Sequence, residues 1–176
     1  MICPCCGHEN IPGTDVCADC NTDLNDLDLP TAGTPLERSF MEDPILRLIL
    51  RDPLTVSPET PIREVITKLV KTGSYCALVV SEKRITGILT ERDILLKLAD
   101  RYDQLGDRPA EEFMTPDPVC LQPTHSLAFG LNRMTVGNCR HVPIEKDGEV
   151  LGVVSVRDVL GYLAEEYSDI IAKAAV

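Results

Sequence analysis

A strand-to-helix junction that occurs twice constrains this chain more than any other feature. Residues 87–93 read Gly-Ile-Leu-Thr-Glu-Arg-Asp, which predicts the end of a buried strand followed at once by a helix. Thr90 is a favourable N-cap, and Asp93 stands at the third helical position. The construction returns at residues 152–158 as Gly-Val-Val-Ser-Val-Arg-Asp, at an offset of 65 residues (158 − 93). We therefore expect two copies of one structural unit, each with a polar cluster at a helix N-terminus.

The sequence around each junction predicts the same order of elements. For the first copy we expect a short apolar helix at 45–50, an extended segment at 52–58, a helix that starts at Thr60 with Pro61 in its first position, strands at 75–80 and 85–89, and a helix from Glu91. For the second copy we expect an entry helix ending at 113–114, an extended segment at 117–123, a helix over 127–134, strands at 139–144 and 150–154 joined by an Asp-Gly turn, and a helix from Val156. Because about 60 residues cannot cover both faces of a small sheet, the two copies should pair.

Composition and charge exclude several classes of protein. The chain has 176 residues, of which 44% are hydrophobic and only 4% aromatic, so its core must rest on Leu, Ile and Val. No apolar run approaches the roughly 20 residues of a membrane span, and the N-terminus lacks a signal pattern, so we expect a cytoplasmic protein without a membrane partner. The net charge of −11 disfavours binding to nucleic acid or anionic lipid.

The cysteines are concentrated at the N-terminus, where five of the eight lie within the first twenty residues. Two Cys-x-x-Cys pairs, Cys3 with Cys6 and Cys17 with Cys20, can present four thiolates tetrahedrally to Zn²⁺. Metal is favoured over disulfides or free thiols, since a segment of fewer than about 25 residues cannot bury a core of its own. The Cys-Pro-x-Cys-Gly start resembles a short zinc ribbon. Iron in a rubredoxin-like Cys₄ site is the alternative, and Cys5 is surplus to four ligands.

Acidic residues surround this cysteine segment. No Lys or Arg precedes Arg38, whereas Asp and Glu are frequent before residue 30, and a Zn–Cys₄ centre would add further negative charge. A phosphate backbone would be repelled. We therefore expect the segment to contact a protein partner of unknown identity, or to cap the rest of the chain.

The repeated junctions, together with Asp52-Pro53 and the strand Arg140-His141-Val142-Pro143-Ile144, resemble the CBS domain, and two such copies resemble a Bateman module. The resemblance covers about residues 41–170. It implies an α/β (α+β) fold in which two β-α-β-β-α repeats pack as a pseudo-twofold pair. The resulting domain prediction is a zinc-ribbon-like metal knuckle at 1–24, a linker at 25–43 with a short helix near 36–41, and repeats at 44–107 and 108–172.

The resemblance also implies a ligand. In the family, the Asp of the junction binds ribose hydroxyls and the Ser or Thr reaches ribose or phosphate, which assigns Asp93, Asp158, Thr90 and Ser155. The short extended segments would line adenine, and charged residues near the junctions would face phosphate; these candidates are Thr55, Val56, Cys120, Leu121, Arg92, Arg157, Arg140 and His141. The first-copy equivalents of the last two, Tyr75 and Cys76, carry no positive charge, so the two sites should be unequal. The alternative for each junction is a capping box, whose spacing is the same.

The leading functional hypothesis is therefore a non-enzymatic regulatory module that binds AMP, ADP or ATP between paired repeats. By resemblance, a homodimer is expected. The alternatives are an iron-containing redox protein in which the repeats serve as scaffold, and a nucleotide-regulated zinc-ribbon protein that binds nucleic acid. Catalysis is disfavoured because the sequence has no P-loop, no Gly-x-Gly-x-x-Gly and no catalytic Ser-His-Asp or Cys-His arrangement.

Overall fold

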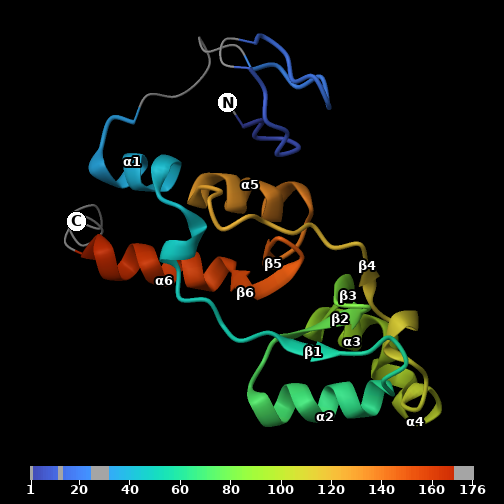
Figure 1. Ribbon diagram of the computed structural model, residues 1–176. Coiled ribbons are helices and arrows are strands. Elements are labelled where there is room, and N and C mark those ends of the chain that lie inside the picture. The colour runs from blue at the N-terminus through green and yellow to red at the C-terminus, as the bar shows by residue number, and fades with distance from the viewer. Residues whose placement is uncertain (1, 12–13, 25–31, 169–176) are drawn as a thin grey trace. The chain divides into compact units, whose positions relative to one another are not determined.

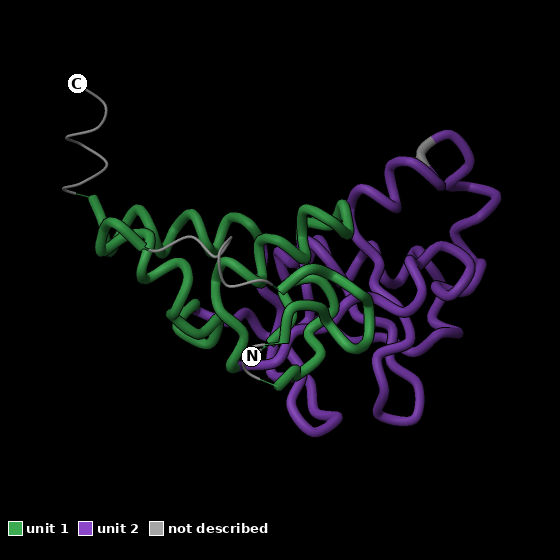
Figure 2. Tube along the Cα trace, turned by 90° about the horizontal axis from the view of Figure 1, so that it is seen from above, with its two compact units in different colours: residues 1–48, 124–140, 156–176 green, residues 49–123, 141–155 purple. Residues whose placement is uncertain are grey.

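The computed structural model describes residues 2–11, 14–24 and 32–168 (Figure 1). The chain divides into two compact units that alternate along the sequence (Figure 2). Unit 1 comprises residues 1–48, 124–140 and 156–176, and unit 2 comprises residues 49–123 and 141–155. Residues 25–31 of the predicted linker lie outside the described residues.

Unit 2 contains a four-stranded sheet of order β1-β2-β3-β4. Its strands are β1 (Leu54–Val56), β2 (Cys76–Ser81), β3 (Arg84–Thr90) and β4 (Thr115–Pro116). Strands β1 and β2 are parallel and the other pairs are antiparallel. A parallel pair needs a crossover, and α2 (Ile62–Thr72) supplies it. Figure 1 shows α2 running alongside β1, and α2 contacts both β1 and β2.

The helix α2 is held by one apolar stripe, as its sequence predicts. Its buried residues are Ile62, Val65 and Leu69, spaced three and four apart. The helix ends at Gly73, whose φ of 66° is the left-handed conformation that glycine adopts without strain. The core around it lies mainly between α2 and the sheet; its fully or nearly buried members are Val56, Ile62, Val65, Leu69, Ala77, Val79, Leu89, Leu98, Ala110 and Phe113.

The predicted start of α2 is wrong by one residue. Thr60 forms no cap, and Pro61 occupies the position before the first helical residue. The amides of Ile62 and Arg63 instead donate to the carbonyls of Arg108 and Gly106. A neighbouring loop therefore satisfies the exposed amides of the first turn, which a side-chain cap would otherwise do.

Both predicted entry helices are single 3-10 turns. These are η2 (Ile45–Arg47) and η4 (Ala110–Glu112), each preceded by a proline. Leu48 leaves η2 in an extended conformation. The chain beyond it must extend, because Arg51 forms an antiparallel bridge with Val153. Apolar composition alone does not distinguish this arrangement from a short helix.

Helical segments and a hairpin complete unit 2. The helical segments are α3 (Glu91–Leu98), η3 (Ala99–Arg101) and α4 (Tyr102–Leu105). The hairpin pairs β5 (His141–Lys146) with β6 (Glu149–Ser155), and its turn places Asp147 and Gly148 at φ of 53° and 81°, as the Asp-Gly signal predicts. The predicted extended segment at 117–123 forms no strand; only Leu121 bridges Ile144, in parallel.

The described residues of unit 1 form the α-helices α1 (Pro35–Glu42), α5 (Leu127–Val136) and α6 (Val156–Glu166). Helix α1 confirms the short helix predicted in the linker, and a capping box between Thr34 and Glu37 starts it. Helix α5 contacts both α1 and α6. Near the end of α1, Asp43 accepts hydrogen bonds from the hydroxyls of Ser39 and Tyr162 and pairs with Arg47 at 2.8 Å. None of the helices within the described ranges combines the length and apolarity that crossing a bilayer requires.

Candidate functional sites

Each Cys-x-x-Cys pair forms a tight backbone knuckle in the N-terminal ribbon, defined as residues 2–24 without the undescribed 12 and 13. In the first knuckle, the amide of Cys3 donates to the His8 carbonyl and that of Gly7 donates back to Cys3. The second knuckle repeats both bonds: the Cys17 amide donates to the Thr22 carbonyl, and the Asn21 amide donates to Cys17. Gly7 and Asn21 take the left-handed conformation, with φ of 78° and 57°.

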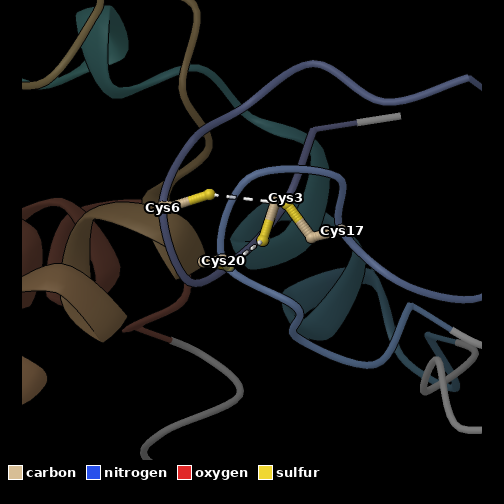
Figure 3. Close-up of side chains that lie close together, drawn as sticks. All are labelled: Cys3, Cys6, Cys17 and Cys20. Atoms are coloured by element: carbon tan, nitrogen blue, oxygen red, sulfur yellow. Dashed lines mark hydrogen bonds between the residues drawn. The ribbon is translucent and has the colours of Figure 1, made fainter.

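The two knuckles bring the four predicted ligands together (Figure 3). The sulfurs of Cys3, Cys6, Cys17 and Cys20 all lie within 4.8 Å of one another. The Cys3–Cys20 and Cys6–Cys17 distances are 3.5 Å and 3.6 Å. Thiolates at the corners of a tetrahedron around Zn²⁺ lie about 3.8 Å apart, given Zn–S bonds of about 2.3 Å. The donor set and its size therefore fit a tetrahedral metal ion, and Cys5 is exposed outside the cluster.

Polar groups around the sulfurs tune their protonation. The Thr22 hydroxyl and amide lower the pKa of Cys20 to about 6. Burial acts to raise the pKa of Cys17, but the amides of Cys20 and Asp19 and the Asn10 side chain lower it overall. The pKa of Cys6 is raised: the His8 backbone lowers it, and burial and the neighbouring cysteines outweigh that effect. A divalent cation would relieve the repulsion among four thiolates, so metal binding should release protons.

Asn10 links the two knuckles, a role that the sequence analysis did not identify. Its side-chain amide donates to the His8 carbonyl and to Cys17 Sγ, and its oxygen accepts from the Ala18 amide. The residue is only 5% exposed. The sequence showed only that Asn10 lies between the two cysteine pairs; its burial, which requires the side chain to find partners, appears only in the structure.

The ribbon also contacts α5 within unit 1. The Arg133 guanidinium donates to the Cys5 carbonyl. A side chain at Gly7 would start 3.5 Å from the Phe129 ring, which in turn meets His125 edge-on at 4.4 Å. His125 therefore packs against an aromatic ring, and the neighbouring Ser126 caps α5.

At the first junction, Thr90 and Asp93 form the capping-box pattern. The Asp93 carboxylate accepts from the Thr90 amide at 2.9 Å, and the Thr90 hydroxyl accepts from the Asp93 amide at 3.3 Å. Asp93 also faces Lys97, whose ammonium lies 3.2 Å from Oδ1, and Thr115, whose hydroxyl lies 3.4 Å from it. Burial would raise the pKa of Asp93, but Thr90 and Lys97 lower it overall. The junction thus presents an ionised carboxylate.

Lys97 is a second residue that the sequence analysis missed. It adds positive charge at the first junction, and its ammonium also donates to the Phe113 carbonyl at 2.6 Å. The available signal was the Asp-x-x-x-Lys spacing, which places both side chains on one face of a helix.

The second junction has the same backbone plan. Ser155 is the last residue of β6 and is buried, and it stands opposite His141 in the hairpin. Asp158 lies in the first turn of α6 and is half-buried. The Val156 amide donates to the Arg140 carbonyl, just as the Glu91 amide donates to Tyr75 in the first copy.

The remaining predicted ligand residues differ in accessibility. Arg92, Arg140, Arg157 and Thr55 are exposed, and Tyr75 is 37% exposed. Val56 and Leu121 are buried, so only their backbone is available to a ligand. Burial raises the pKa of Cys76 to about 12 and that of Cys120 to about 11, so both remain neutral thiols at pH 7.

Comparisons with known proteins agree with this architecture. The CBS domain family model matches residues 45–100 and 110–165. Among solved structures, a CBS domain protein from Pyrobaculum aerophilum complexed with AMP is 31% identical, covers 76% of this chain and 99% of its own, and superimposes with a TM-score of 0.61. The CBS domain pair of protein MJ0100, in complex with methylthioadenosine and S-adenosylmethionine, is 22% identical over 70% of this chain and 97% of its own and shares the fold, with a TM-score of 0.62.

Curated relatives share the repeats within proteins that are mostly longer. An uncharacterized 33.4 kDa protein of Thermofilum pendens is 33% identical over 69% of this chain and 39% of its own length. The Arabidopsis thaliana protein CBSCBSPB1 is 32% identical over 68% of this chain and 23% of its own. This chain thus spans less than half the length of either relative. The two matched repeats, and their strand-to-helix junctions, place this chain in the CBS domain family.

Proposed function

We propose that this chain is a non-enzymatic regulatory module that binds an adenine nucleotide, AMP, ADP or ATP, between its paired repeats. The observation that carries the proposal is the junction that occurs twice in the chain. In its first copy, an ionised Asp93 faces two hydroxyl groups and a lysine at the start of a helix. The AMP complex of the Pyrobaculum aerophilum relative, 31% identical, supports the choice of ligand.

The chemistry of the junction suits a nucleotide. A carboxylate can accept two hydrogen bonds from the cis-diol of ribose, and helix N-terminal amides favour nearby phosphate. Asp93 and Asp158 would bind ribose, and Thr90 and Ser155 would assist them. Arg92, Arg140, His141 and Arg157 would face phosphate, and the segments around Thr55 and Cys120 would line the base.

Calorimetric titration of the full chain with AMP, ADP and ATP tests the proposal. The wild type should bind at least one of them, and a variant that carries both Asp93→Ala and Asp158→Ala should bind about tenfold or more weakly, the loss expected for a charged hydrogen-bonding group. Asp103→Ala, on the exposed face of α4, is the control and should bind normally. The absence of binding by the wild type, or undiminished binding by the double variant, would refute the proposal.

We propose that the ribbon binds Zn²⁺ through Cys3, Cys6, Cys17 and Cys20 and serves as a structural or protein-interaction element. The sulfur distances support a tetrahedral ion, and the acidic surroundings disfavour nucleic acid. The hydrogen bond from Arg133 to the Cys5 carbonyl would anchor the ribbon to α5. Purified protein should be colourless, and elemental analysis should find one zinc ion per chain. A brown, redox-active protein that contains iron would favour the alternative metal.

We further propose a homodimer, as the family resemblance implies. Leu95 and Leu96 on α3 are 67% and 75% exposed, a costly arrangement for adjacent leucines unless a second copy covers them. Analytical ultracentrifugation should give the dimer mass for wild type and the monomer mass for a Leu95→Glu and Leu96→Glu variant. A monomeric wild type would overturn this proposal and leave nucleotide binding unaffected.

A further inference from the structure

Three side chains from separate segments of unit 2 form a stack. The Arg51 guanidinium carbon lies 5.6 Å from the centre of the Tyr75 ring, within the range of a cation–π interaction. The Tyr75 ring also stacks on the His141 ring: their centres lie 6.3 Å apart, at an interplanar angle of 24°. Arg51 precedes the first repeat's short strand, whereas His141 begins a strand of the second. The stack therefore joins the two repeats.

The stack lies beside both junctions. The Tyr75 carbonyl accepts a hydrogen bond from the Glu91 amide at 3.2 Å, and the next residue, Cys76, pairs with Thr90. On the other side, His141 pairs with Ser155. The backbone thus places Tyr75 next to the first Thr-x-x-Asp junction and His141 next to the second.

The backbone of Arg51 is held in place. Its carbonyl accepts the Val153 amide at 3.3 Å. The adjacent Gly152 leaves no space for a side chain, since an added Cβ would lie 3.0 Å from the Arg51 carbonyl oxygen and 2.9 Å from Leu50 Cβ. A guanidinium on a fixed backbone, restrained by an aromatic face, loses little entropy when it binds a ligand.

We propose that Arg51 is a phosphate-binding residue of the nucleotide site and that Tyr75 positions it. This inference rests on the proposed nucleotide function and adds a residue that the junction motif does not contain. A guanidinium packed against a ring still directs N–H groups outward along its edge, in the fork that matches phosphate oxygens. Tyr75 and Cys76 stand where the second copy has Arg140 and His141, so the first copy lacks the charge of that pair, and Arg51 supplies it. Affinity should accordingly rise with the number of phosphates.

Calorimetry of the full chain with AMP, ADP and ATP, at two salt concentrations, tests this role. Arg51→Ala should weaken ATP binding by about tenfold to a hundredfold, the range for a charge-assisted hydrogen bond, and weaken AMP binding less. Its affinity for ATP should also depend less on salt than that of the wild type. Tyr75→Leu should weaken ATP binding as Arg51→Ala does. Tyr75→Phe, which keeps the ring, should retain wild-type binding. Arg84→Ala, at the exposed start of β3, is the matched control.

The outcomes separate this inference from the function on which it rests. If the wild type binds nucleotides and Arg51→Ala binds them equally well, the role of Arg51 is wrong and the proposed function stands. An equal loss for AMP, ADP and ATP with an unchanged salt dependence would show a structural role and would also overturn it. If the wild type binds none of the three, both proposals fail. Arg51→Lys, which keeps charge but not the planar fork, should bind ATP with intermediate affinity and provides a second measurement should Arg51→Ala fold poorly.

Discussion

Thr90 and Asp93 hold each other through three hydrogen bonds across the start of α3. The Thr90 hydroxyl donates to Asp93 Oδ2 at 2.6 Å, the Thr90 amide donates to the same oxygen, and the Asp93 amide donates to the Thr90 hydroxyl. The capping interpretation of the motif is thus realised in the structure. The family resemblance assigns the same two side chains to ribose. The other carboxylate oxygen of Asp93, Oδ1, is not part of the cap and faces Lys97 and Thr115.

The first prediction concerns this cap. Thr90→Val removes the hydroxyl at similar volume, and we expect it to lower the free energy of unfolding by about 0.5–2 kcal/mol, the usual value of an N-cap. Urea denaturation followed by circular dichroism measures the change. Thr67→Val provides the control, because the Thr67 hydroxyl only donates back to the Arg63 carbonyl inside α2. Equal stability of the Thr90 variant and wild type would show that the junction is not a cap in solution.

The second prediction concerns acid. Burial works against ionisation of Asp93, but Thr90 and Lys97 lower the pKa of Asp93 below its value in the unfolded chain. A carboxyl with a lowered folded pKa stabilises the fold above its unfolded pKa, near about 3.9, and loses that contribution as pH falls through the folded value. The Ser39 hydroxyl, followed by Tyr162 and Arg47, lowers the pKa of Asp43 against its burial, so Asp43 acts in the same direction.

Urea midpoints measured from pH 6 to pH 3 check this dependence. Stability should be level at the upper end and should fall below about pH 4. Asp93→Asn, which can still cap but cannot ionise, should show a shallower fall than wild type. Identical pH profiles would mean that Asp93 is not stabilised as a carboxylate.

Much of the fold followed from the 65-residue offset, because strands and helices of the repeats are coded by local apolar patterns. What failed depended on contacts distant in sequence. The predicted cap Thr60 does not accept from the first amides of α2; the carbonyls of Gly106 and Arg108 accept these hydrogen bonds. The turn between β2 and β3 did form between the predicted strands, and its residues Glu82 and Lys83 take the left-handed conformation, with φ of 49° and 66°.

The site was predictable to a similar extent. The four sulfurs meet as their spacing indicated, since each pair lies within one short knuckle. Lys97 was missed although its spacing from Asp93 is local, whereas Asn10 and Arg51 acquire their roles from contacts with other segments. For Arg51 that segment is Tyr75, and no periodicity links the two residues.

The third prediction concerns Gly152, whose missing side chain admits the Arg51 segment. Gly152→Ala should destabilise the protein by about 1–3 kcal/mol, the usual cost of overpacking, because the nearest atoms are the Arg51 backbone and the Leu50 Cβ. Gly161→Ala is the control: no atom lies within 4 Å of its added Cβ, and in a helix it should stabilise by about 0.5–1 kcal/mol. Chemical denaturation of both variants should therefore give shifts of opposite sign, and a neutral Gly152→Ala would contradict the close approach.

The fourth prediction concerns Asn10. Asn10→Ala removes three hydrogen bonds that link the knuckles, including the one to Cys17 Sγ, and should weaken zinc binding by about tenfold to a hundredfold, as loss of groups around metal ligands does. Competition with a chromogenic chelator measures the affinity. Asn132→Ala, exposed on α5, should bind zinc as wild type does. Zinc affinity unchanged in Asn10→Ala would show that the knuckles hold their geometry without this link.

The fifth prediction separates the two adjacent cysteines of the ribbon. Cys6 belongs to the four-sulfur cluster, whereas Cys5 is exposed and contributes only its backbone amide, which donates to Cys3 Sγ. Cys6→Ser should therefore lose tight zinc binding, and Cys5→Ser should keep one zinc per chain. Because the apolar cluster in the described part of this short segment is small, with Cys3, Cys17 and Leu24 as its buried members, chelation should unfold the ribbon while the repeats stay folded. Hydrogen exchange of wild type with and without chelator reads out both regions, and loss of zinc from Cys5→Ser in place of Cys6→Ser would assign the site to the other register.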